Sequence, residues 1–94
     1  MRRGAMRATM LAAALAVLLP LAAEAADRAS CREYAEAAIR QVRGGINHPR
    51  CQPGMQGARW SADEAVHYNW CLAASDAAIG AERNARTAYL RSCM

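Results

Sequence analysis

The stretch that decides the fold is SCREYAEAAIRQVRGG, residues 30–45. Its apolar positions recur every three or four residues, which places them on one face of a helix. These positions are Cys31, Tyr34, Ala35, Ala38, Ile39 and Val42. Ser30 and Glu33 have the spacing of a capping box, and Gly44-Gly45 is typical of a helix end. We therefore expect a helix over residues 31–43, with one face buried.

A long loop is expected after this helix. Residues 44–59 contain two Pro, four Gly and Asn47, and such residues interrupt regular structure. This loop also carries Cys51. A loop of this length in a small domain has to be tied to the rest of the fold.

A second helix is predicted over residues 61–74. Ser61 and Glu64 form another capping box, and the neighbouring Trp60 and Ala65 have the spacing of a hydrophobic staple. The helix carries two apolar stripes, formed by Ala65, Tyr68 and Leu72 and by Val66 and Trp70. We therefore expect it to be covered on more than one side, with Trp70 enclosed.

A third helix is expected from Ser75-Asp76 to Cys93, with Glu82 and Arg86 paired one turn apart. No segment alternates apolar and polar residues at period two, so no strand is expected. The predicted fold is all-α, a small three-helix up-down bundle with a long first loop. The break at Ser75 is modest, and a single continuous helix over the last two segments is the alternative.

The first 25 residues have the three parts of a signal peptide. Arg2, Arg3 and Arg7 are followed by an apolar run over residues 10–19, and Ala23-Glu24-Ala25 offers a cleavage site. We expect cleavage after Ala25, which leaves residues 26–94 as one domain in the periplasm or outside the cell. The apolar segment is shorter than the roughly 20 residues that span a bilayer, so no stable membrane span is expected after cleavage.

The charge of the expected mature chain is small. Nine of the 12 Arg and seven of the eight acidic residues lie in residues 26–94, which gives a net charge near +2. The arginines are scattered rather than clustered, unlike those of a nucleic-acid-binding surface. We therefore expect no nucleic-acid partner.

The four cysteines predict two disulfides, since a short exported chain with an even cysteine count usually oxidises them. If the first helix rises, the second descends and the third rises again, Cys71 returns to Cys31 and Cys93 reaches the loop with Cys51. The predicted pairs are therefore Cys31–Cys71 and Cys51–Cys93. If the last two helices are continuous, Cys51–Cys71 with Cys31–Cys93 is the better choice.

The order of these residues resembles a family of small exported bacterial proteins of uncharacterised function. The matching motifs are Cys31-x2-Tyr34-Ala35, Cys51, Gly57-x-Arg59-Trp60, His67-x2-Trp70-Cys71 and a terminal Cys93. The resemblance covers nearly all of the mature chain. It implies a secreted four-cysteine module and no particular activity.

The residue pattern contains two candidate chemical sites. His48, Cys51, His67 and Cys71 are a ligand set that zinc accepts, which makes a periplasmic metal-binding protein the alternative function. Asp63, His67 and Cys71 place an acid, a base and a thiol on one helix face, as a small thiol enzyme or hydrolase would need. Oxidised cysteines would remove both, so we expect no metal, no cofactor and no catalytic residue.

A binding role is the remaining hypothesis. Arg59 and Trp60 are residue types that often anchor protein interfaces, and they form the candidate binding patch. The sequence thus favours a non-enzymatic secreted or periplasmic module that binds a protein or an envelope component.

Overall fold

The structure is a computed structural model that describes residues 26–94. The expected signal peptide and its cleavage site after Ala25 lie outside these residues. The described chain folds as α2 (Arg28–Ile46), two short 3₁₀ turns, η2 (Gln52–Gly54) and η3 (Ala58–Trp60), then α3 (Glu64–Ala73) and α4 (Asp76–Cys93). No strand occurs in this part of the chain, so the prediction of an all-α three-helix fold is confirmed.

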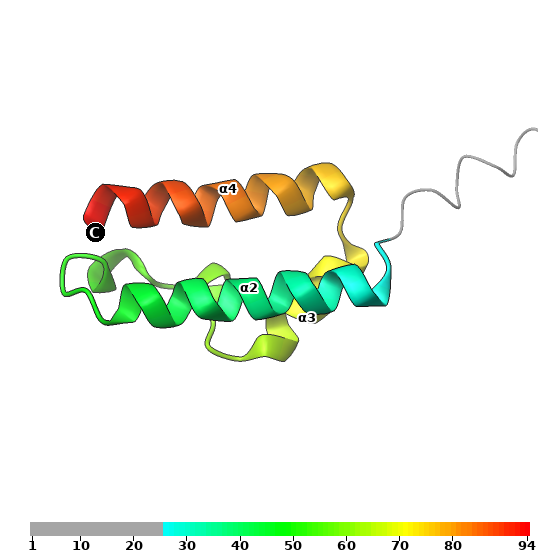
Figure 1. The fold of residues 1–94 in the computed structure, drawn as a ribbon, viewed down its shortest axis with the longest axis horizontal. Coiled ribbons are helices and arrows are strands. Elements are labelled where there is room, and N and C mark those ends of the chain that lie inside the picture. Colours follow the sequence, from blue (N-terminus) through cyan, green and yellow to red (C-terminus); the bar gives the residue numbers. More distant parts are fainter. Residues whose placement is uncertain (1–25) are drawn as a thin grey trace, which may run out of the picture.

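The three helices alternate in direction, as an up-down bundle requires (Figure 1). α2 and α4 run the same way side by side, and α3 passes behind α2 and leads back to the end of the bundle where α2 begins. α3 packs mainly against α2. Within residues 26–94, no helix combines the length and the hydropathy needed to cross a bilayer.

Helix α2 begins three residues earlier than expected. Its N-cap is Asp27, whose Oδ1 accepts a hydrogen bond from the backbone N–H of Ser30 at 2.8 Å. The Ser30 hydroxyl also donates to Asp27 Oδ2 at 3.1 Å. These bonds stabilise the ionised carboxylate and lower the pKa of Asp27. The predicted cap at Ser30 was wrong because an aspartate with the same capping chemistry precedes it.

The predicted end of α2 at Gly44-Gly45 was also wrong, since the helix continues to Ile46. Gly45 is buried where α2 meets α4. A Cβ atom at Gly45 would lie only 2.7 Å from Leu90 Cδ2 and 2.9 Å from Met55 Cε. This glycine therefore allows a close approach of side chains and does not terminate the helix.

Helix α3 begins later than expected. Its N-cap is Asp63, which accepts from the backbone N–H of Ala65 at 3.0 Å, while Ser61 Oγ accepts from the N–H of Asp63. The predicted capping box of Ser61 and Glu64 was therefore wrong. The only buried residues of α3 are His67 and Cys71, so the expectation of a helix covered on several sides was wrong too.

The break between α3 and α4 is confirmed. Ser75 is the N-cap of α4, and its Oγ accepts from the backbone N–H of Ala78 at 3.2 Å. The predicted pair of Glu82 and Arg86 is present at 4.0 Å. Because the chain reverses at Ser75, Cys93 lies at the end of the bundle that carries the loop with Cys51.

Both predicted disulfides are present, Cys31–Cys71 and Cys51–Cys93, with Cα–Cα distances of 5.5 and 5.2 Å. Each lies in its own group of buried side chains. The larger group, here the Trp60 cluster, consists of Val42, Cys51, Met55, Trp60, Leu90 and Cys93. The smaller group, here the Tyr34 cluster, consists of Cys31, Tyr34 and Cys71.

Trp60 belongs to this core and is not the staple of α3 that the sequence predicts. It is 8% exposed, and its ring lies 5.4 Å from that of Tyr89. The Tyr89 hydroxyl donates to the carbonyl oxygen of Cys51 at 2.8 Å. Trp60 and Tyr89 thus hold the long loop against α4 together with the Cys51–Cys93 disulfide.

Candidate functional site

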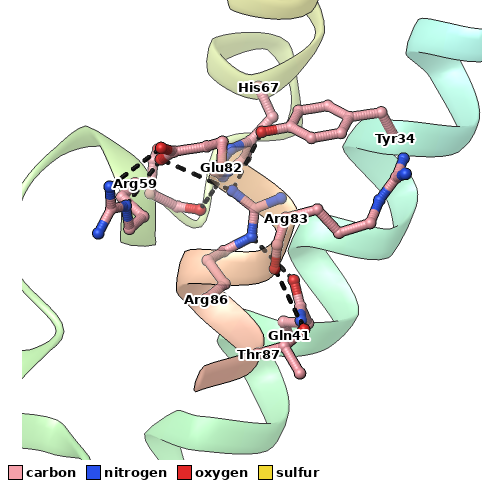
Figure 2. A network of polar contacts seen from close by, with 9 residues as sticks. Tyr34, Gln41, Arg59, His67, Glu82, Arg83, Arg86 and Thr87 are labelled. Atoms are coloured by element: carbon pink, nitrogen blue, oxygen red, sulfur yellow. Dashed lines mark hydrogen bonds and ion pairs between the residues drawn. The ribbon is translucent and has the colours of Figure 1, made fainter. Parts of the chain in front are cut away.

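A buried arginine organises the polar side of the Tyr34 cluster (Figure 2). Arg86 is 1% exposed; its Nε donates to Gln41 Oε1 at 2.8 Å, and its Nη1 donates to Tyr34 Oη at 3.1 Å. Its guanidinium lies 5.0 Å from the centroid of the Tyr34 ring. A buried charge costs several kcal/mol unless hydrogen bonds and opposite charges compensate it. Here the bonds of Arg86 link α4 to α2 and hold the ring of Tyr34.

A second arginine connects the loop to α4. Arg59 donates from Nε and Nη2 to the two carboxylate oxygens of Glu82, at 2.8 and 3.0 Å. These hydrogen bonds from Arg59 lower the pKa of Glu82 and outweigh the effect of its partial burial. The side chain of Arg59 is 46% exposed and that of Glu82 is 22% exposed, and Figure 2 shows the pair beside the Tyr34 hydroxyl and Arg86.

His67 is buried next to this ion pair. Its Nε2 lies 2.8 Å from the carbonyl oxygen of Ser61. Because a carbonyl oxygen only accepts, Nε2 carries the proton in this arrangement. His67 therefore fixes the chain that leads into α3.

Trp70 lies on top of the Tyr34 cluster and faces solvent. Its ring stacks on that of Tyr34, with centroids 5.7 Å apart and planes inclined by 30°. It is nevertheless 40% exposed, and Val66, one turn earlier on α3, is 37% exposed. Both line a cavity of about 130 Å³ whose other walls are Tyr34, Ala58, Arg59, His67 and Glu82.

No related protein identifies this site. Comparison with protein-family models, with curated proteins and with solved structures finds no match. The resemblance to four-cysteine exported proteins stays a prediction. The function of the site therefore has to be argued from its own geometry.

The candidate metal ligands do not form one site. Cys51 and Cys71 belong to different disulfides, at the two ends of the bundle. His67 is hydrogen-bonded to Ser61, and His48 is a half-buried residue of the loop. Within residues 26–94, no group of three or more His, Cys, Asp or Glu side chains is placed to hold a metal ion.

The candidate acid, base and thiol of α3 likewise do not form one site, because each of them is engaged with a different partner. The sulfur of Cys71 is bonded to that of Cys31, so it offers no thiolate nucleophile in the oxidised fold. Asp63 is engaged as the N-cap of α3.

The predicted binding patch combines one exposed and one buried residue. Arg59 lies at the surface beside the cavity, but Trp60 is buried and cannot contact a partner. The exposed tryptophan is Trp70, which sequence reasoning placed inside. The available signal was the small size of the chain, since short domains bury a smaller fraction of their surface and leave more apolar groups exposed.

Proposed function

We propose that residues 26–94 form a non-enzymatic module, exported to the periplasm or outside the cell, that binds a protein partner through the Trp70 surface. The Trp70 surface is defined as Ala58, Arg59, Val66 and Trp70. The observation that carries the proposal is the exposure of Trp70 and Val66 around one cavity. Two disulfides agree with an oxidising compartment.

The size of the cavity favours a protein over a small molecule. Pockets for small ligands usually enclose about 300–1,000 Å³. A cavity of about 130 Å³ suits one inserted apolar side chain instead. Trp70 and Val66 would then pack against the partner around that side chain.

Rigidity also supports this use of Trp70. Tyr34 is 2% exposed, and it is held from below by the hydrogen bond from Arg86. Trp70 stacks on this fixed ring, so little side-chain freedom is lost when a partner covers it. The ion pair of Arg59 and Glu82 supplies the polar rim that surrounds the apolar centre of many interfaces.

The test is capture of a partner from an envelope extract, followed by affinity measurement with the purified pair. Trp70→Ala should weaken binding about 30-fold or more, as truncation of a central tryptophan commonly does. The matched control is Asn69→Ala, because Asn69 is exposed on the same helix and lies outside the cavity. Equal affinities of the two variants, or the absence of any saturable partner, would contradict the proposal.

A further inference from the structure

A second hollow surface lies along the seam between α2 and α4. It consists of two cavities, of about 710 and 450 Å³, which share the lining residues Ala37, Arg40 and Arg83. The two cavities therefore adjoin at these residues, and together they are called the groove here. The larger cavity ends near the beginning of both helices, and the smaller one ends at Leu90 and Met94.

The junction of the two cavities is positively charged. Arg40 comes from α2 and Arg83 from α4, and neither makes an ion pair within residues 26–94. The guanidinium of Arg83 lies 5.6 Å from the ring centroid of Tyr34. Figure 2 shows its side chain reaching from α4 toward α2. Two like charges that line one groove without a direct ion-pair partner leave a place where an anion is favoured.

The two ends of the groove differ in polarity. Beyond the arginines, the smaller cavity is walled mainly by apolar groups, which include Ala37, Gly44, Leu90 and Met94. The larger cavity carries three carboxylates instead, those of Asp27, Glu33 and Asp76. An anionic group would be repelled from that end and would stay at the junction.

We propose that this groove binds a fatty acid. The carboxylate would lie between Arg40 and Arg83, where guanidinium groups donate charge-assisted hydrogen bonds. The alkyl chain would extend along the apolar half toward Leu90 and Met94. A volume of about 450 Å³ falls in the range of roughly 300–1,000 Å³ of small-ligand pockets. A single negative charge matches two arginines that have carboxylates close by better than a multivalent phosphate does.

Two glycines offer a test that leaves the fold intact. A Cβ atom at Gly44 or at Gly80 would have no heavy atom within 4 Å, so both positions have room for a larger side chain. Gly44 lines the apolar half of the groove, and Gly80 lines the carboxylate half. Gly44→Leu should block the alkyl chain, whereas Gly80→Leu is the same change at the end that the ligand does not use.

The experiment is calorimetric titration of the purified mature domain, disulfides intact, with decanoate. Decanol tests the need for the charge, and acetate tests the need for the chain. Saturable binding of decanoate is expected, with the affinity reduced about ten-fold or more by Gly44→Leu and by Arg40→Gln. Gly80→Leu and Arg43→Gln should bind as the parent does, since Arg43 is exposed on α2 outside the groove.

Several outcomes would overturn the inference. One is no saturation by decanoate at about 1 mM, the weakest affinity that such a site should show. Others are equal binding of decanol, or an unchanged affinity in Gly44→Leu. No residue that lines the smaller cavity also lines the cavity of the Trp70 surface, so Trp70→Ala should bind decanoate normally.

Discussion

The two disulfides stabilise regions of opposite character. Around Cys51–Cys93, six buried side chains of the Trp60 cluster pack from α2, the loop and α4. Around Cys31–Cys71, the Tyr34 cluster has three buried members and is backed by the buried Arg86. Tyr34 also lines two of the cavities. The end with the Trp60 cluster therefore has the larger buried core, and the end with the Tyr34 cluster has the smaller core and the cavity of the Trp70 surface.

The largest effect should come from removing the disulfides. Replacing both cysteines of either pair by Ala should lower the free energy of unfolding by about 4 kcal/mol, because the closed loops are nearly equal in length at 40 and 42 residues. The local consequence should differ. Without Cys31–Cys71, the amides of α3 should lose protection from hydrogen exchange first, since α3 buries only His67 and Cys71.

Denaturant melts and hydrogen exchange measured on both double variants test this difference. The variant that lacks Cys51–Cys93 serves as the matched control for α3. The same exchange pattern along the chain in both variants would contradict the division into two regions.

The next largest effect should distinguish the two tryptophans. Trp60→Ala should lower the free energy of unfolding by about 3 kcal/mol, because it leaves a cavity in the Trp60 cluster, where the ring is only 8% exposed. Trp70→Ala should cost about 1 kcal/mol, mainly the stacking on Tyr34. Thermal and denaturant melts of the two variants measure both losses in the free energy of unfolding. A larger loss for Trp70→Ala would mean that the exposed ring is a core residue and not a binding anchor.

The smallest effect concerns pH. The pKa of Glu82 is lowered in the folded protein, chiefly by hydrogen bonds from Arg59. The ionised Glu82 therefore stabilises the folded state at pH values above the ordinary carboxylate pKa. This stabilisation is lost as the pH falls from about 4.5 through the lowered value. Glu82→Gln should therefore flatten the acid limb of the stability profile, by less than about 1 kcal/mol because the pair is partly solvated.

The matched control for this measurement is Glu36→Gln, at an exposed position of α2 without an ion pair in residues 26–94. Melting temperatures between about pH 2 and 7 should separate the two variants. An acid limb that is unchanged in Glu82→Gln would show that the pair of Arg59 and Glu82 does not contribute to stability.

The sequence by itself predicted the number and order of the helices, and it favoured the break at Ser75 and the cysteine pairing that follows from this break. The structure decided between that pairing and the alternative with one continuous last helix. These features depend on local hydrogen bonding, on the 3.6-residue period of the apolar positions and on helix lengths. All three can be predicted from residues that are close together in the sequence. The direction of three helices then decides which cysteines meet. For the candidate site the sequence pointed to Arg59 and Trp60 by residue type, and binding by these residues stays a prediction.

Only the tertiary structure decided which apolar groups are covered. The sequence predicted that Trp70 is enclosed and that Trp60 belongs to a binding patch, yet Trp60 packs against Tyr89 in the core and Trp70 remains 40% exposed. The sequence around Gly45 is typical of a helix end. In the structure, Gly45 lies within α2, and its lack of a side chain lets Leu90 and Met55 pack closely against this helix. A periodic pattern tells which residues share a face, but coverage of that face depends on neighbours brought from elsewhere in the chain.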